Sequence, residues 1–311
     1  MRPHTSTARL ASTIRNARLR RWLQLPALAA VVIWGAAFPI VKFALAEFPV
    51  LAYAALRPVI AVAVLFGLLW VRGEPLGIER GDWRRLLAAG YGGMALFQLC
   101  FILGLGYTSA SHSALLLCTS PLLGAVALWL TRKEPVSLRS LAGLLLGLTG
   151  VALVVVQADP SGTASLTGDL LTLLAALGWV GVTVLPGSLV ARYGPVKVTA
   201  WLLLAGATVL VAIGWREMLV AVRQPPSLLA WLSLLYSAVV AMVLANVLWQ
   251  RAVRALGSTQ TLVFFYLQPV IAILLAAVVL GERLNPLQLT GGAITLLGVG
   301  LVQRHRRSEA R

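Results

Sequence analysis

Long apolar runs, separated by short polar segments, fill most of the sequence after residue 24. A membrane-spanning helix needs about 20 predominantly apolar residues, whereas a strand of a membrane barrel alternates in polarity over about half that length. The runs therefore predict an all-α polytopic membrane protein. We expect ten transmembrane helices, close to residues 25–45, 52–71, 86–105, 110–130, 138–157, 169–190, 197–215, 228–249, 259–280 and 286–302.

The second half of the chain repeats the first. Pro269 follows Pro121 by 148 positions (269 − 121), and Gly298 follows Gly150 by the same distance. A constant register of this kind indicates a duplicated half. Each half holds five of the expected spans, an odd number, so the second half would enter the membrane in the opposite direction. That arrangement is an inverted repeat, which transporters use to place a central site between two halves.

The N-terminal parts of the two halves follow the repeat less closely. Trp34 and Trp179 are 145 positions apart (179 − 34), not 148. We divide the chain into a basic tail, a first five-helix repeat, a second five-helix repeat and a second basic tail. The boundaries are 1–24, 25–157, 158–302 and 303–311.

Composition and charge agree with a membrane bundle. Hydrophobic residues make up 59% of the chain, charged residues 12%, and the mean hydropathy is +0.88, values that exclude an ordinary soluble domain. With the N-terminus placed in the cytoplasm, the inner loops and tails hold 21 of the 26 Lys and Arg residues and the outer loops hold three. This bias predicts cytoplasmic termini and a cell (inner or plasma) membrane location.

The same count argues against nucleic acid as a partner, because the net charge of +16 is spread over five loops and two tails. The six arginines of residues 1–24, with no acid among them, indicate a cytoplasmic tail; a transit peptide is the alternative.

Catalytic chemistry has little support in the sequence. The three histidines do not form a zinc motif or a Ser-His-Asp set, and no P-loop or G-x-S-x-G elbow is present. We therefore expect no enzyme activity, no metal and no cofactor. Both cysteines lie in apolar runs, where a thiol behaves as a small hydrophobe.

The distribution of charge within the spans favours an acidic or zwitterionic substrate. All ten acidic residues fall in loops, tails or span ends, whereas proton-coupled export of organic cations needs a carboxylate near the middle of the membrane. Lys42 and Arg57 lie within or beside the apolar runs, where they would attract a carboxylate. Snorkelling of these two side chains to the interface is the alternative.

Other polar and aromatic residues within the spans are candidates to line a substrate cavity. Trp34 and Trp179 stand out because they occupy matching positions of the two halves. Anchoring at the lipid interface and hydrogen bonding between helices are the alternatives for residues of these types. The candidate substrate-binding residues are Trp34, Phe38, Lys42, Arg57, Gln98, Tyr107, His112, Trp179, Gln250, Gln260, Tyr266 and Gln268.

Proline and glycine positions point to bending and to close packing. Pro121 and Pro269 correspond under the repeat, and each would free a carbonyl four residues earlier, so we interpret them as hinges; a static bend is the alternative. The glycines of the fifth and tenth spans predict close helix packing or a homodimer interface. They are Gly143, Gly147, Gly150, Gly291, Gly292, Gly298 and Gly300.

Four segments together resemble the EamA-type transporters of the drug/metabolite transporter superfamily. They read WGAAFPIVK from Trp34, AALRPVIA from Ala54, GLGYTSASHSALLLCTSPLLGAVALWL from Gly104 and QPVIAILLAAVVLGERLNPLQLTGGAITLLGVGL from Gln268. The resemblance implies ten helices in two inverted five-helix repeats, cytoplasmic termini and export of amino acids or related metabolites. The chain departs from the pattern at Arg132-Lys133-Glu134, where the family has Leu-Gly-Glu.

The sequence thus predicts a secondary transporter in the lipid bilayer that exports a small carboxylate-bearing or zwitterionic metabolite by alternating access. A membrane scaffold without transport is one alternative. A carrier of cations, drugs or nucleotide sugars is another.

Overall fold

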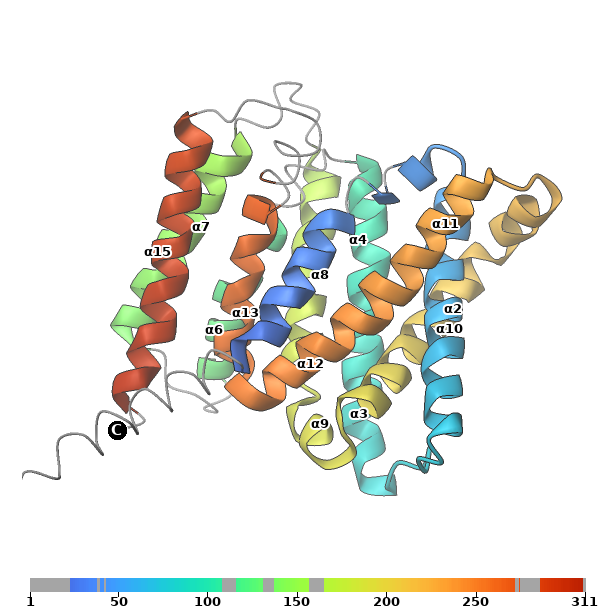
Figure 1. The fold of residues 1–311 in the computed structure, drawn as a ribbon, viewed down its shortest axis with the longest axis horizontal. Coiled ribbons are helices and arrows are strands. Elements are labelled where there is room, and N and C mark those ends of the chain that lie inside the picture. Colours follow the sequence, from blue (N-terminus) through green and yellow to red (C-terminus); the bar gives the residue numbers. More distant parts are fainter. Residues whose placement is uncertain are drawn as a thin grey trace, which may run out of the picture.

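The chain folds as a bundle of helices (Figure 1). The computed structural model describes residues 23–37, 40–41, 43–107, 116–130, 137–156, 165–271, 274 and 286–309. Every regular element within these ranges is helical, which confirms the all-α class. After an apolar helix at Leu23–Ala37, the elements are α2 (Val50–Val71), η1 (Arg80–Asp82), α3 (Trp83–Ala89), η2 (Gly90–Ala95), α4 (Leu96–Tyr107), α6 (Ser120–Leu130), α7 (Leu138–Val156), α8 (Leu166–Val184), α9 (Gly187–Tyr193), α10 (Pro195–Arg223), α11 (Leu228–Tyr236), η3 (Ser237–Leu244), α12 (Ala245–Leu256), α13 (Ser258–Leu262), η4 (Val263–Tyr266) and α15 (Pro286–Glu309).

Helix lengths fit a multi-pass membrane protein. Within the described residues, five helical stretches are long and apolar enough to cross a membrane, and shorter apolar helices accompany them. Two helices continue past their expected ends: α10 reaches Arg223 instead of residue 215, and the stretch that contains α12 reaches Leu256 instead of residue 249. The total of ten spans and their inverted arrangement stay predictions.

Local sequence explains where several helices begin and end. The side chains of Ser165 and Ser227 cap α8 and α11 by accepting hydrogen bonds from backbone N–H groups of the first turn. Gly194 adopts a φ of 82°, which a residue with a side chain rarely does, and Pro195 follows it as the first residue of α10. These signals separate α9 from α10 without a long loop.

Two π-helical segments interrupt the bundle at matching positions. The first, η2, joins α3 to α4, and the second, η3, joins α11 to α12. Their first residues, Gly90 and Ser237, are 147 positions apart (237 − 90), close to the register of the sequence repeat. Short π segments are rare and occur mostly at functional sites, because they leave backbone carbonyls without their usual partners.

Glycines let α7 and α15 pack with their backbones almost in contact. A Cβ atom added at Gly298 would lie 2.7 Å from the carbonyl oxygen of Gly143, and one added at Gly150 would lie 2.6 Å from that of Gly291. Figure 1 shows the two helices side by side at one end of the bundle. Gly143, Gly150 and Gly298 therefore pack within one chain, whereas Gly300 borders open space; a homodimer interface stays a prediction.

Two carboxylates tie the first part of the chain to the second near the start of α2. Oε2 of Glu217, on α10, accepts a hydrogen bond of 2.9 Å from the backbone N–H of Leu51. Glu47 accepts two hydrogen bonds from Ser227, from its N–H at 2.7 Å and from its Oγ at 2.8 Å. Donation from the Ser227 N–H, and then from its hydroxyl, lowers the pKa of Glu47 from the ordinary value of 4.5.

We expect Gly298→Ala to destabilise the protein, because its Cβ would push the backbone of α7 away. Overpacking of this kind costs about 1–3 kcal/mol. Thermal unfolding of the purified protein in detergent measures the change. Gly300→Ala is the matched control, since no atom lies within 4 Å of a Cβ at that position and the same helix carries it. Equal melting temperatures for the two variants would contradict this packing.

We expect Glu47→Gln to lower the melting temperature by a few degrees at neutral pH, with the difference closing in acid. A carboxylate whose folded pKa is lowered stabilises the fold above its ordinary pKa, and that contribution is lost as the pH falls through the folded pKa. Melting curves of both proteins, recorded from neutral pH to well below 4.5, test this. A pH-independent difference would show that charge on Glu47 is not the cause.

Candidate functional site

A cavity of about 440 Å³ lies inside the bundle. This volume falls in the range of about 300–1,000 Å³ that is usual for small-molecule sites. Its walls come from the first helix, α2, η2, α4, α8, η3, α12 and the segment around residue 265. The described lining residues are Trp34, Ala37, Val41, Leu45, Arg57, Met94, Phe97, Gln98, Phe101, Ile102, Leu117, Trp179, Ala241, Met242, Asn246, Phe265 and Gln268.

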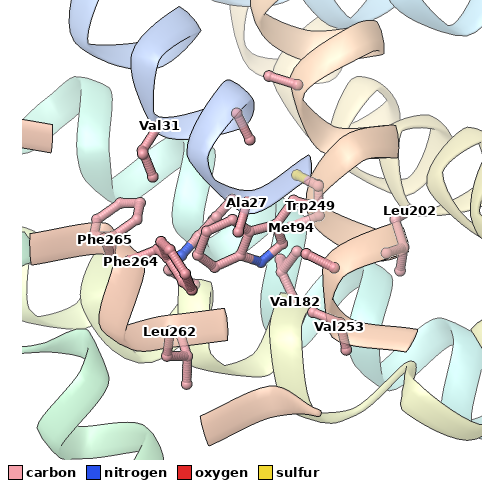
Figure 2. Packing of buried hydrophobic residues seen from close by; sticks show 14 of the residues in the cluster. Ala27, Val31, Met94, Val182, Leu202, Trp249, Val253, Leu262, Phe264 and Phe265 are labelled. Atoms are coloured by element: carbon pink, nitrogen blue, oxygen red, sulfur yellow. The ribbon is translucent and has the colours of Figure 1, made fainter. Parts of the chain in front are cut away.

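Four aromatic rings, those of Trp34, Trp179, Trp249 and Phe265, pack against one another beside the cavity. The ring centroids of Trp34 and Trp179 are 5.0 Å apart, those of Trp34 and Trp249 are 5.4 Å apart, and those of Trp179 and Phe265 are 5.4 Å apart. Figure 2 shows Trp249, Phe264 and Phe265 converging with Val31 of the first helix. Ring pairs in such edge-on and tilted arrangements attract one another and give a rigid apolar wall.

The π segment η3 holds one of these rings in place. Nε1 of Trp34 donates a hydrogen bond of 2.8 Å to the carbonyl oxygen of Ala241, which lies within η3. A carbonyl displaced from the usual helical pattern is free to accept a side-chain donor. The indole of Trp179 differs, because its Nε1 has no hydrogen-bond partner in the described structure.

Polar groups in the cavity are few. Arg57 lines it from α2, with its guanidinium 5.4 Å from the ring centroid of Tyr53 and its Nε without a hydrogen-bond partner among the described residues. The amides of Gln98, Asn246 and Gln268 also line it, and each of these side chains is less than a tenth exposed. None of the described lining residues is acidic. The described lining therefore carries one guanidinium and no carboxylate.

Residues at corresponding positions of the two halves share this cavity. Met94 and Met242 are 148 positions apart (242 − 94), and Gln98 and Asn246 have the same spacing. All four line the cavity, as do Leu117 and Phe265, which repeat in the same register. Interpretation by residue type alone missed the methionines, Leu117 and Phe265, because they look like ordinary core residues. The repeat register is the sequence signal that could have found them.

The residues proposed from sequence fall into three groups. Five line the cavity: Trp34, Arg57, Gln98, Trp179 and Gln268. Four lie elsewhere in the described structure: Tyr107, Gln250, Gln260 and Tyr266. Three lie outside the described residues: Phe38, Lys42 and His112.

Two residues of the second group join helices together. Nε2 of Gln250 donates a hydrogen bond of 3.1 Å to the carbonyl oxygen of Val182, linking α12 to α8. Tyr266 is fully buried, and its hydroxyl donates to the carbonyl oxygen of Leu144 at 3.0 Å. Tyr107, in contrast, is 57% exposed at the end of α4.

The two repeated prolines free carbonyls that border the cavity. Pro121 leaves the carbonyl of Leu117 without its helical donor, and the hydroxyl of Ser120 donates to it at 2.6 Å. Pro269 likewise leaves the carbonyl of Phe265 without its helical donor. That carbonyl oxygen lies 3.9 Å from the thiol sulfur of Cys118, which donates to it. A thiol is a weaker donor than a hydroxyl, so the Phe265 carbonyl is less well satisfied than the Leu117 carbonyl.

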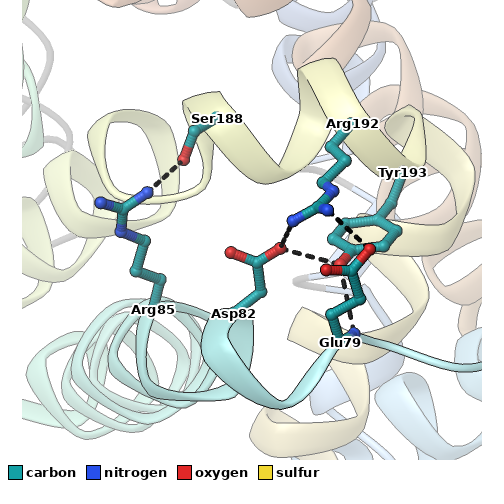
Figure 3. A network of polar contacts seen from close by, with 6 residues as sticks. All are labelled: Glu79, Asp82, Arg85, Ser188, Arg192 and Tyr193. Atoms are coloured by element: carbon teal, nitrogen blue, oxygen red, sulfur yellow. Dashed lines mark hydrogen bonds and ion pairs between the residues drawn. The ribbon is translucent and has the colours of Figure 1, made fainter.

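A polar network joins α9 to the connection between α2 and α3 (Figure 3). Arg192, on α9, contacts Glu79 at 2.6 Å and Asp82 at 2.8 Å. The hydroxyl of Tyr193 donates to the same Asp82 oxygen at 2.8 Å and accepts a 3.2 Å hydrogen bond from the Glu79 N–H. Because one guanidinium bridges two carboxylates and Tyr193 adds two further hydrogen bonds, the network holds α9 against the connection between α2 and α3.

Comparison with known proteins adds independent information. The model of the EamA-like transporter family matches the chain twice, over residues 21–156 and again over residues 166–304. An uncharacterized transporter of Archaeoglobus fulgidus is 30% identical over 277 residues, covering 87% of this chain and 93% of the relative. YetK of Bacillus subtilis, also an uncharacterized transporter, is 27% identical over 276 residues, covering 87% of this chain and 83% of the relative.

Two further similarities concern a named activity and the fold. A probable terminal-alkyne amino-acid exporter of Streptantibioticus cattleyicolor is 28% identical over 287 residues, covering 90% of this chain and 94% of that protein. One solved crystal structure has a TM-score of 0.73 at 20% identity, covering 92% of this chain and 98% of the other. At that identity the structure supports the shared fold alone.

Proposed function

Because the chain belongs to the EamA-like transporter family, we propose that it is a secondary transporter that exports a small amino-acid-like metabolite by alternating access. The cavity carries this proposal: it is of ligand size, lined by aromatic rings and amides, and contains Arg57 with no acid among its described lining residues. A carboxylate-bearing or zwitterionic substrate fits that lining better than a drug-like cation does. The name of the Streptantibioticus relative, an amino-acid exporter, is consistent with this class.

The proposed architecture is two inverted five-helix repeats, residues 25–157 and 158–302, in a cell (inner or plasma) membrane with both termini in the cytoplasm. Support comes from the two successive matches to one family model, from the matching π segments and from the paired cavity residues. In this orientation the network around Arg192 lies at the cytoplasmic end.

The direct test is transport by the purified protein in proteoliposomes. Uptake and counterflow are measured against a panel of amino acids, amines, carboxylates and nucleotide sugars, with and without a pH gradient. Counterflow of one or more amino acids supports the proposal. Transport of amines only, or of no member of the panel, would overturn the proposed substrate class.

We expect Arg57→Gln to weaken substrate binding strongly, because a hydrogen bond to a charged group is worth about 1.5–3 kcal/mol, or roughly ten- to a hundredfold in affinity. The apparent KM for the transported amino acid measures this. Arg216→Gln is the matched control, since its guanidinium also lies 5.4 Å from an aromatic ring centroid, that of Trp215, away from the cavity. Equal effects of both substitutions would remove the proposed role of Arg57.

We expect Pro269→Ala to slow transport with little change in substrate affinity. Alanine restores the N–H group that the Phe265 carbonyl lacks, which straightens and stiffens the helix. Pro121→Ala serves as the comparison and should have the smaller effect, because the hydroxyl of Ser120 already satisfies the carbonyl freed there. An unchanged transport rate in Pro269→Ala, measured by counterflow, would remove the hinge role.

A further inference from the structure

Asn246 presents a fixed hydrogen-bond acceptor at the cavity wall. It is the second residue of α12, directly after the π segment η3, and its side chain is 7% exposed. Its Nδ2 donates a hydrogen bond of 2.8 Å to the carbonyl oxygen of Met242. Flipping the amide would bring two acceptor oxygens together, so this bond sets which atom is the oxygen.

The remaining atom, Oδ1 of Asn246, is buried without a hydrogen-bond partner in the described structure. A buried carbonyl oxygen with no donor is unfavourable, and the cost disappears once a donor is supplied. Gln250, one turn further along α12, also has an unpartnered oxygen, but it does not line the cavity. Asn246, in contrast, lines the cavity. Less than 1 Å² of its Oδ1 is accessible, so we infer that a small movement of the side chain brings this oxygen to a donor of a bound molecule.

The other unpartnered groups of the cavity have the opposite polarity. Nε of Arg57, Nε2 of Gln98 and Nε1 of Trp179 are donors that no described residue satisfies. These donors complement a carboxylate, whereas Oδ1 of Asn246 complements an ammonium group. Because no described lining residue is acidic, the ammonium of a zwitterion has few other acceptors there.

We propose that Asn246 recognises the ammonium group of the substrate, so that the cavity selects an α-amino acid with an apolar side chain over the matched carboxylic acid. The carboxylate of the substrate lies toward Arg57, and the apolar side chain lies against the rings of Trp34 and Phe265. This inference rests on the proposed transport function. It adds one specificity-determining residue, Asn246, and the substrate group that this residue recognises, the ammonium.

Two matched trios of compounds test the inference in proteoliposomes. The first is leucine, 4-methylpentanoate and 3-methylbutylamine; the second is phenylalanine, 3-phenylpropanoate and 2-phenylethylamine. Each compound competes with the counterflow of a radiolabelled amino acid. In the wild type, we expect the amino acid to compete at least about tenfold better than the matched carboxylic acid that lacks the amino group. This factor corresponds to the loss of one hydrogen bond to a charged group.

Asn246→Leu keeps the approximate size of the side chain and removes the acceptor. It should bring the amino acid and the matched carboxylic acid to within about threefold of each other, since the discriminating hydrogen bond is gone. Asn246→Asp adds a negative charge at the same place and should increase competition by the amine. Gln250→Leu is the matched control: it removes a buried amide from the same helix outside the cavity and should leave the preference unchanged.

The outcomes separate this inference from the function on which it rests. An undiminished preference for the amino acid in Asn246→Leu would overturn the inference while leaving amino-acid transport standing. Uniform loss of competition by all three members of a trio, with Asn246→Asp also failing to favour the amine, would assign Asn246 a structural role and overturn it as well. Failure of the wild type to move any amino acid would overturn the proposed function itself.

Discussion

The requirement that every backbone polar group find a partner in an apolar environment shapes this structure. A regular helix meets that requirement within itself, so any interruption leaves a carbonyl that must be satisfied by other means. Two π segments, and the residues whose carbonyls two prolines leave without a helical donor, Leu117 and Phe265, all contribute to the lining of one cavity. The freed groups then help to position the cavity walls. The carbonyl of Ala241, for example, accepts the hydrogen bond that holds the indole of Trp34.

Packing away from the cavity differs from packing around it. Glycine contacts bring α7 against α15 with almost no space between their backbones. Around the cavity, large rings meet edge-on, and several buried polar atoms have no partner in the described structure. Such atoms are costly, so they are expected where a ligand or a second conformation supplies what is missing. The cavity therefore coincides with the departures from regular packing.

The polarity of the cavity follows from a small number of side chains. Arg57 supplies positive charge, and the amides supply both donors and acceptors. The rest of the described lining is mostly apolar, so these few groups act in a low dielectric. Their orientation matters more there than it would at a surface. Specificity can then depend on single atoms, such as Oδ1 of Asn246.

Composition and span length determined the helical class and the membrane setting, because the physical demands of a bilayer act on every long segment alike. The transporter family was identified separately, from the resemblance of four segments to EamA-type proteins. The sequence also placed Trp34, Trp179 and Arg57 among the cavity candidates. It could not decide between Gln98, which lines the cavity, and Gln250, which joins α12 to α8. Nor could it distinguish the buried hydroxyl of Tyr266 from a ligand contact. The face that a polar residue presents depends on helix rotation and on contacts across the bundle, and only the tertiary structure determines both.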